Sequence, residues 1–300
     1  MAFLRKKSEK FEMNQLQTQP NSLANIQNAA TALAQNYQNL GIEHSEGVWG
    51  KKHLRNLDVK KFRGDNVYIW QTRIYRDINY FISYIYALKI DKLGLHTKFK
   101  ESGLFGAETF TFQDKLVSRD LIDSIIELNY LEERLQLSNI KHLNILDIGA
   151  GYGRLAKRIQ EGFEDVRVEC IDAIPVSTCL SRFYLDEYIR NGSVVVHQLD
   201  SVEAIPRGTI KLAINIHSFS EMTINSVQYW VDFLVEKEVE YVFVVPNGPG
   251  LTLNDGSDFS ELFEKASYRI IGKDSKYVDA DFAKFAIYPS NYYLLKRDFE

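Results

Sequence analysis

Three carboxylates and a glycine-rich turn are the groups in this chain whose types and spacing suit ligand chemistry. Asp147 stands two positions before the first glycine of the segment Asp147-Ile-Gly-Ala-Gly-Tyr-Gly153. Glycines in such a turn let the backbone bend tightly and leave room for a ligand against the main chain. Asp172 and Asp200 each follow another apolar run of strand length. Because the carboxyl ends of parallel strands meet at one edge of a sheet, we expect the three carboxylates to share one site.

The glycine spacing separates two kinds of nucleotide site. Dinucleotide-binding domains carry G-x-G-x-x-G and point a helix N-terminus at a pyrophosphate. Here the spacing is G-x-G-x-G, and the Asp147 carboxylate would repel a pyrophosphate but suits the ammonium group of a methionine moiety. Asp172 is placed to accept hydrogen bonds from both ribose hydroxyls, and Asp200 with Ser201 to meet an adenine edge. The pattern indicates S-adenosylmethionine rather than a dinucleotide.

The same segments carry a resemblance to a known family. Residues 143–300 resemble the class I methyltransferase fold, whose first signature the glycine motif matches. The segment Ala213-Ile-Asn-Ile-His-Ser-Phe-Ser-Glu-Met222 is similar to the Asn-x-x-Ser-Phe-x-Glu-Met segment of the sugar O-methyltransferase family. Phe62-Arg-Gly64 and the stretch 117–127 also resemble that family's upstream region, so the similarity covers most of residues 47–300. The family includes enzymes assigned to deoxysugars of polyketide antibiotics and to sugars of bacterial surface glycans.

The resemblance implies an S-adenosylmethionine-dependent O-methyltransferase that acts on a sugar hydroxyl, free, nucleotide-linked or within a glycan. It also implies the residues that bind the cofactor, with S-adenosylhomocysteine as product: Asp147, Gly149, Ala150, Gly151, Gly153, Arg154, Asp172, Ala173, Asp200, Ser201 and Asn215. Some sugar methyltransferases hold a diol on magnesium. No acidic cluster in this sequence requires that ion, and no metal ligands are assigned.

His217 and Glu221 are the candidates for proton transfer. Methyl transfer from a sulfonium is an in-line displacement, so the enzyme must align donor and acceptor and remove the hydroxyl proton. His217 follows the fourth apolar run, and a histidine with an ordinary pKa of roughly 6.5 is a suitable base. Glu221 lies four residues later and could orient its ring. The alternative is that His217 and Ser218 only cap a helix.

The first half of the chain has helical periodicity. Residues 1–19 are rich in Gln and Asn and are expected to be poorly ordered. An apolar stripe from Leu23 to Leu40 then predicts a helix that packs on its own chain, with a dimer as the alternative. Further stripes predict helices from Val67 to Leu88 and from Ser118 to Leu135. We expect a tail and helix over 1–46 and a helical cap on the acceptor side over 47–139.

Residues 45–64 contain a basic cluster, which is either a solvated surface or a site for an anionic acceptor. From position alone, four residues of the cap are predicted to touch the acceptor, and the first is also a second candidate base: His53, Arg63, Tyr75 and Tyr80.

From residue 143 the period changes, and strand-length apolar runs alternate with helical stretches. These runs cover 143–148, 166–171, 194–198, 210–216 and 241–245. The alternation predicts a parallel sheet with right-handed crossovers. Two β-rich pieces, 268–271 and 291–295, follow without an obvious helix between them, so the last pair is expected to be antiparallel. The fold class is therefore α/β, a Rossmann-like seven-strand sheet over 140–300 with an N-terminal helical region.

The composition excludes several classes of protein. A net charge of -4 and a pI near 5.9 argue against a nucleic-acid partner, as does the lack of an Asn/Asp-Pro-Pro-aromatic signature after the fourth run. Cys170 and Cys179 have no metal-ligand spacing, no apolar run is long enough to span a membrane, and no signal peptide is evident. A cytoplasmic enzyme is expected, with a homo-oligomer left open. Two alternatives remain: a methyltransferase for a polyketide or phenolic hydroxyl, and a non-catalytic S-adenosylmethionine-binding module.

Overall fold

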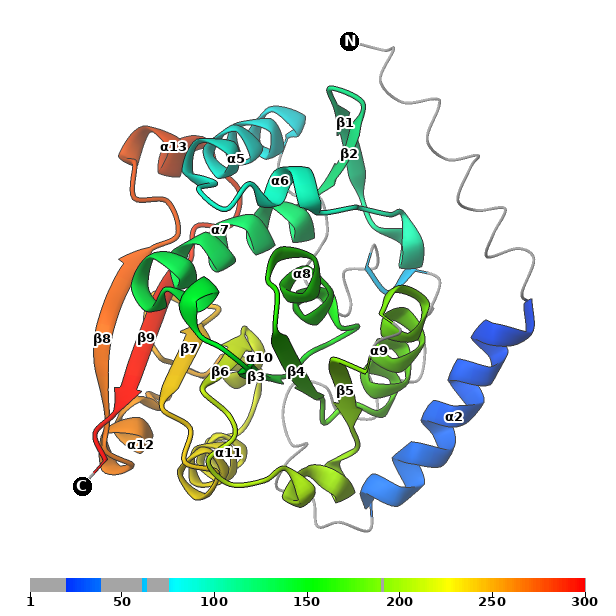
Figure 1. Cartoon of the computed structure of the whole chain (residues 1–300), viewed down its shortest axis with the longest axis vertical. Helices are drawn as coiled ribbons and strands as arrows, with labels where there is room; N and C mark the ends of the chain where they lie inside the picture. Colours follow the sequence, from blue (N-terminus) through cyan, green and yellow to red (C-terminus); the bar gives the residue numbers. More distant parts are fainter. Residues whose placement is uncertain (1–19, 39–60, 64–75, 190–191, 300) are drawn as a thin grey trace.

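A sheet of seven strands runs through the centre of the molecule, and helices cover both of its faces (Figure 1). The computed structural model describes residues 20–38, 61–63, 76–189 and 192–299. The spatial order of the strands is β5-β4-β3-β6-β7-β9-β8. Their bounds are β3 Leu143–Ile148, β4 Val166–Ile171, β5 Val194–His197, β6 Leu212–Ile216, β7 Tyr241–Val245, β8 Tyr268–Ser275 and β9 Asn291–Arg297.

The direction of the strands follows the predicted pattern. Strands β3 to β7 are mutually parallel, and β9 runs antiparallel to both β7 and β8. The expected Rossmann-like seven-strand sheet with an antiparallel last strand is therefore confirmed. The expectation that no helix separates the final pair is wrong, because α13 (Ala280–Phe285) lies between them, capped by the Asp279 side chain. Six residues are too few to show a helical period in the sequence.

The central strands are buried on both faces, and the two faces have separate apolar cores. In β3, Leu143 and Ile145 belong to one core, while Leu146 and Ile148 belong to the other. Parallel strands covered on both sides read as continuous apolar runs, which is the pattern that predicted them. The helices of this half are α8 Arg154–Gly162, α9 Pro175–Tyr188, α10 Ser218–Glu221, α11 Ile224–Glu236 and α12 Ser260–Lys265, with a 3-10 helix at Leu199–Ala204.

The first described helix, α2 (Pro20–Gln38), packs on its own chain. Its buried residues recur with helical spacing, and they join both apolar cores. At its end the Tyr37 hydroxyl lies 3.4 Å from the Thr178 hydroxyl and accepts a hydrogen bond from the N–H of Leu199 at 3.2 Å. The prediction that this stripe contacts its own chain is confirmed.

The N-terminal cap differs from the helical region expected there. Of the helix predicted from Val67 to Leu88, the described part is α5 (Asp77–Ile90), which follows an extended Arg76 with ψ of 156°, and residues 67–75 lie outside the described residues. A hairpin of β1 (Thr109–Phe112) and β2 (Lys115–Ser118), which the sequence analysis missed, turns at Gln113 and Asp114, both with positive φ. Helix α7 (Arg119–Leu135) is confirmed with its Ser118 cap, which accepts from the N–H of Leu121. The remaining elements are α6 Leu95–Lys98 and 3-10 turns at Leu104–Gly106 and Leu137–Asn139.

Candidate functional site

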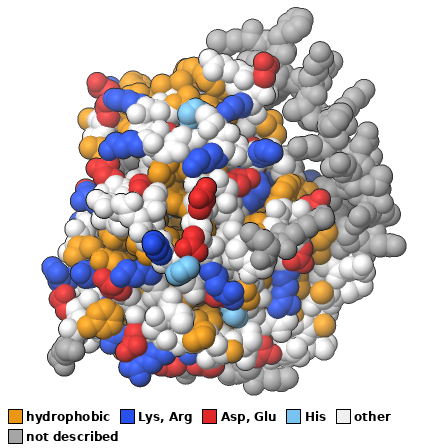
Figure 2. All heavy atoms as spheres, viewed as in Figure 1, with side chains coloured by type: hydrophobic (Ala, Val, Ile, Leu, Met, Phe, Trp, Pro, Cys, Tyr) orange, Lys and Arg blue, Asp and Glu red, His pale blue; other side chains and the backbone are white. Residues whose placement is uncertain are grey.

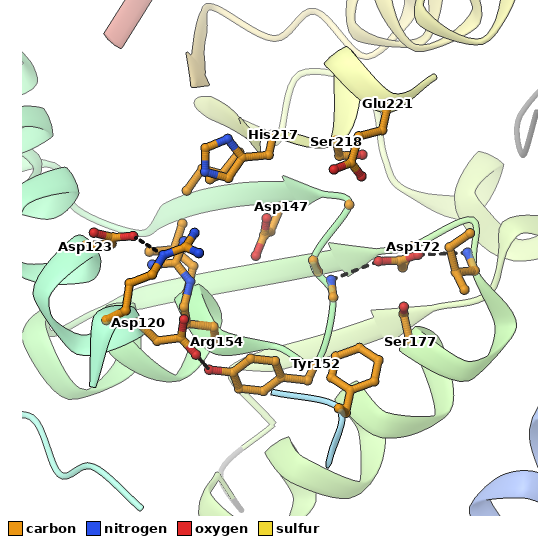
Figure 3. A pocket seen from close by; sticks show the side chains of 18 residues that line it. Asp120, Asp123, Asp147, Tyr152, Arg154, Asp172, Ser177, His217, Ser218 and Glu221 are labelled. Atoms are coloured by element: carbon orange, nitrogen blue, oxygen red, sulfur yellow. Dashed lines mark hydrogen bonds and ion pairs between the residues drawn. The ribbon is translucent and has the colours of Figure 1, made fainter. Parts of the chain in front are cut away.

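A pocket opens at the carboxyl ends of β3, β4 and β6 (Figure 3). Strand β3 lies between β4 and β6, so the chain crosses to one side of it and then to the other. Ligands of open α/β sheets bind at such a point. The pocket is lined by Phe62, Arg119, Asp120, Asp123, Asp147, Gly149, Ala150, Gly151, Tyr152, Arg154, Leu155, Asp172, Ile174, Ser177, Ile216, His217, Ser218 and Glu221.

The three glycines of the turn after β3 have positive φ, but they serve different purposes. A Cβ on Gly149 would lie 2.4 Å from the Ser218 side chain, so this glycine lets α10 approach the turn. A Cβ on Gly153 would lie 2.7 Å from Leu185, so this glycine lets α8 start against α9. A Cβ on Gly151 would meet nothing within 4 Å. Gly149 and Gly151 line the pocket, whereas Gly153, predicted to bind the cofactor, is needed for helix packing.

The carboxylate of Asp172 is oriented by the backbone at the end of β4. Its Oδ2 accepts a hydrogen bond from the N–H of Gly151 at 2.8 Å, and its Oδ1 accepts one from the N–H of Ile174 at 2.7 Å. Burial raises the pKa of Asp172 to about 7, although these two N–H groups act to lower it. Each oxygen keeps a second lone pair. The group is therefore oriented to accept two further hydrogen bonds from a ligand.

Asp147 lies buried at the end of β3, beside the same turn (Figure 3). Burial raises the pKa of Asp147 to about 7, and the neighbouring Arg154 lowers it only in part. Arg154 is itself engaged with α7, because its Nη1 donates to Glu127 Oε2 at 2.8 Å and to the Ser124 hydroxyl at 2.9 Å. A positively charged ligand group would thus stabilise the ionised form of Asp147.

Asn215, predicted to hold cofactor or acceptor, fastens the strands instead. It is buried in β6, where its Nδ2 donates to the carbonyl of Ile148 at 2.9 Å. Its Oδ1 accepts from the N–H of Phe219 at 2.8 Å. These bonds tie the end of β3 to the start of α10, and Asn215 does not line the pocket.

The residues predicted to meet an adenine edge also lie elsewhere. Strand β5 ends at His197, and Asp200 and Ser201 fall in the following 3-10 helix. The Ser201 hydroxyl bonds the backbone of Gln198, and Asp200 is exposed. Neither residue lines the pocket, and nor does Ala173, although its neighbours Asp172 and Ile174 do. The tight 3-10 turn draws this segment away from the pocket wall.

His217 precedes α10 in a left-handed conformation with φ of 67°. Its ring makes no capping hydrogen bond, and within the described part of the chain its buried Nδ1 has no hydrogen-bond partner. Burial, together with the charge of Arg119, lowers the pKa of His217 to about 3. The ring is therefore neutral at neutral pH and can accept a proton at Nδ1 in the tautomer that carries hydrogen on Nε2.

Glu221 is not brought to His217, although the two were predicted to act together. In Figure 3 the side chains extend to opposite sides of Ser218, with His217 toward Asp123. Glu221 Oε1 accepts from Asn247 at 3.4 Å, and its charge acts on Asp172. The left-handed backbone at His217 directs the ring toward α7. Asp123 is the acidic residue whose charge raises the pKa of the ring.

The polar face of α7 forms a wall of the pocket that the sequence analysis missed. Asp123 lies between two cations, accepting from Arg119 Nε at 3.2 Å and from Lys276 Nζ at 2.5 Å. The signal was present, because Asp120, Asp123 and Glu127 recur at steps of three and four. A charged stripe on a helix whose other face is apolar does not by itself show whether it faces solvent or a pocket, and here all three side chains are buried.

Arg63, predicted to touch the acceptor, belongs to a buried ion network beneath the pocket. Its Nη2 bonds Glu101 and its Nε bonds Asp120, each at 3.1 Å, and its Nη1 bonds the carbonyl of Ser102 at 3.0 Å. Its side chain is 0% exposed, so no donor is left for a ligand. Tyr80 is likewise a core residue. His53 and Tyr75 lie outside the described residues, and their contacts with an acceptor stay predictions.

The described residues contain no group of three or more His, Cys, Asp or Glu side chains arranged to hold a metal ion. Within the same ranges, every helix is too short or too polar to cross a membrane. Figure 2 shows acidic and basic side chains interspersed over the described part of one face rather than gathered by sign.

No family model and no curated protein match this chain. Among solved structures it is similar to the cyclase SpnF, with 13% identity over 61% of this chain and 84% of that chain and a TM-score of 0.46. It is also similar to magnesium protoporphyrin IX methyltransferase from Synechocystis PCC 6803, solved with bound S-adenosylmethionine, with 10% identity over 72% and 97% of the chains and a TM-score of 0.43. A third is the mitomycin 7-O-methyltransferase MmcR, with 18% identity over 60% and 57% and a TM-score of 0.41.

Proposed function

We propose that this chain is an S-adenosylmethionine-dependent O-methyltransferase whose acceptor is a sugar hydroxyl. The observation that carries the proposal is the pair of buried carboxylates, Asp147 and Asp172, on either side of the open glycine turn. Each has its pKa raised to about 7, so each gains from a ligand that stabilises its ionised form. The ammonium group at one end of the cofactor would stabilise the ionised form of Asp147. The two ribose hydroxyls at the other end would stabilise the ionised form of Asp172.

The fit of the cofactor follows from what each group already bonds. Asp172 is fixed by two backbone N–H groups and has its remaining lone pairs available, as recognition of a diol requires. The cation that acts on Asp147 is Arg154, whose guanidinium is also bonded to Glu127 of α7. Gly151 has no atoms near its Cβ position, so a ligand can lie against its backbone. Asp147, Gly149, Gly151 and Asp172 are thus the residues we assign to the cofactor.

The cofactor supplies an electrophilic methyl group, and the chain supplies alignment and a proton acceptor. His217 lines this pocket, and its ring is neutral at neutral pH. His217 would take up the proton that the acceptor hydroxyl loses, at the Nδ1 that has no hydrogen-bond partner among the described residues. Asp123, across the pocket on α7, stabilises the imidazolium that results.

The chemistry of the acceptor wall supports a sugar over a flat aromatic acceptor. Arg119, Asp120, Asp123 and Ser218 offer hydrogen-bonding groups in the pocket beyond the glycine turn. A polyketide or phenolic acceptor would require an apolar slot in their place. The sequence similarity of residues 213–222 to sugar O-methyltransferases supports the same choice.

Calorimetric titration of S-adenosylmethionine and S-adenosylhomocysteine tests the cofactor assignment. We expect saturable binding to the wild type that weakens at least about tenfold in Asp147→Asn and in Asp172→Asn, because each loses a charge-assisted contact worth about 1.5–3 kcal/mol. Asp186→Asn, an exposed position on α9, is the matched control and should bind as the wild type does. Lack of binding by the wild type would overturn the assignment.

Turnover separates an enzyme from a binding module. Release of S-adenosylhomocysteine is measured with panels of neutral sugars, sugar acids, nucleotide sugars, surface glycans and phenols. Methylation confined to sugar acceptors supports the proposal, whereas methylation confined to phenols replaces the acceptor class. If the chain binds the cofactor but methylates none of these acceptors, and if wild type and His217→Asn release S-adenosylhomocysteine equally slowly, the non-catalytic binding module remains.

A further inference from the structure

We propose that the acceptor carries an anionic group, a carboxylate or a phosphate, and that Arg119 binds this group while His217 receives the hydroxyl proton. This deepens the proposed function and rests on it, because the acceptor site is that of the same methyl transfer. Arg119 is the first residue of α7 and lies in the pocket wall, in the same lining as His217.

The guanidinium of Arg119 is fixed by its neighbours, but one of its nitrogens has no hydrogen-bond partner among the described residues. Its Nε donates to Asp123 Oδ2 at 3.2 Å, and its plane lies over the Tyr288 ring at 4.2 Å. Its Nη1 is buried and, among the described residues, has no hydrogen-bond partner. Leaving a buried donor of a charged group unpaired is costly, so such a group points to a ligand that is missing.

The carboxylates that act on Arg119 are shared with other cations. Asp123 serves both Arg119 and Lys276, whose Nζ is bonded to its other oxygen at 2.5 Å. The charge of Asp120 also acts on Arg119, but the Oδ2 of Asp120 is bonded to Arg63. A negative charge on the acceptor would add a partner for Arg119 itself.

Two unpaired buried atoms define the geometry that the acceptor must match. One is the donor Nη1 of Arg119, and the other is the acceptor Nδ1 of His217. Arg119 is also the charge that most lowers the pKa of His217, which places the two groups close together. An acceptor with an acidic group near its reacting hydroxyl would meet both. Among sugars, that describes a uronic acid or a sugar phosphate.

An anionic acceptor would also make His217 a stronger base. An anion at Arg119 offsets the charge that disfavours a protonated imidazole, so it raises the basicity of His217 when the correct acceptor is bound. A neutral sugar would leave the ring a poor proton acceptor. The anionic group would then affect turnover as well as binding.

The experiment uses the full chain saturated with S-adenosylhomocysteine and titrated with inorganic phosphate and with acetate. We expect at least one of the two anions to raise the Tm of the wild type in a saturable manner. The effect should weaken at least tenfold in Arg119→Gln and in Arg119→Lys, which retains the charge but lacks the second nitrogen. The control is Arg134→Gln, an exposed partner of Asp274, which should respond as the wild type does. If one of the two Arg119 variants fails to fold, the response of the other variant decides the test.

A second series identifies the source of the charge. Glucose, glucuronate and glucose 6-phosphate are compared by the ring ¹⁵N shift of His217, which should move with the acidic sugars and not with glucose. A larger effect of glucuronate selects a carboxylate, and a larger effect of the phosphate selects a phosphoryl group. Absence of any anion effect on a wild type that binds S-adenosylhomocysteine overturns this inference alone. Failure to bind that compound overturns the proposed function, which is a separate result.

Discussion

Asp147 and Asp172 are held in a state that favours their protonated forms until a ligand arrives. Burial raises the pKa of each to about 7, against 3.8 for the free group. Binding of a cationic cofactor requires the ionised forms, so binding should release protons. We expect the affinity for S-adenosylmethionine to fall as the pH is lowered from about 8 to 6. Asp147→Asn should flatten this dependence, as measured by calorimetry in buffers of different ionisation enthalpy.

The same raised pKa values predict a stability that decreases with rising pH. Between about pH 4 and 7 the ligand-free folded protein keeps protons that the unfolded chain has released, so the free energy of unfolding falls across this range. Asp147→Asn removes this penalty. Without cofactor, its Tm should exceed that of the wild type by about 2 °C or more at pH 8 and by little at pH 4. A lower Tm of the variant at pH 8 would contradict the assigned protonation.

His217 can be tested without disturbing its unusual backbone. Asparagine tolerates a left-handed conformation better than most residues, so His217→Asn should fold normally. We expect kcat to fall by about 10²- to 10⁴-fold, the usual effect of removing a general base, with cofactor affinity unchanged. A kcat within twofold of the wild type would show that the proton leaves by another route.

The cofactor side of the site was predictable from sequence, whereas the acceptor side was not. Gly149, Gly151 and Asp172 act through local turns at strand ends, so apolar runs and glycine spacing suffice to find them. Asp123 and Lys276 are 153 residues apart, and only the folded chain brings them together. Arg63 was misjudged because a basic residue in a charged stretch gives no sign that two carboxylates will bury it.

At the scale of elements, the turn after β3 depends on how closely α10 approaches it. In Gly149→Ala the new Cβ would overlap the Ser218 side chain at 2.4 Å, in addition to the strain of positive φ. In Gly151→Ala only the strain remains, about 1 kcal/mol. We therefore expect Gly149→Ala to lower the Tm much more than Gly151→Ala, while both weaken cofactor binding. Ser218→Gly should restore part of the loss in Gly149→Ala and nothing in Gly151→Ala.

The five parallel strands were predicted well because each contains an apolar run between turns, whereas β8 also extends through the polar residues 272–275. The elements that were missed are short or depend on tertiary contacts. The hairpin β1–β2 has four-residue strands, and α13 has six residues. In each case the local pattern is too brief to compete with packing.

At the scale of the molecule, the ion network of Arg63 joins the N-terminal cap to the sheet domain. Burial alone would raise the pKa of Glu101, but Arg63 and Arg158 hold it at about 2, below its ordinary value of 4.5. This contribution to stability is complete above about pH 4.5 and is lost as the pH falls toward 2. Arg63→Met should cost about 3–5 kcal/mol at pH 7, because it leaves buried carboxylates unpaired. Its stability should also depend less steeply on pH below 4.5.

Urea unfolding at pH 7 and at pH 4 measures both effects. Arg134→Met is the control, since it breaks an exposed ion pair with Asp274 and should cost less than about 1 kcal/mol. Equal losses in the two variants would show that the network contributes no more than a surface pair.

The position of β9 in the sheet has a consequence for how the chain is made. β9 lies between β7 and β8 but follows both in the sequence. On the ribosome, β7 and β8 emerge before the strand that joins them, so each presents an open hydrogen-bonding edge while translation continues. Open edges invite pairing with other chains. The interval before β9 emerges and inserts between β7 and β8 is thus the one in which a nascent chain of this protein is most exposed to aggregation.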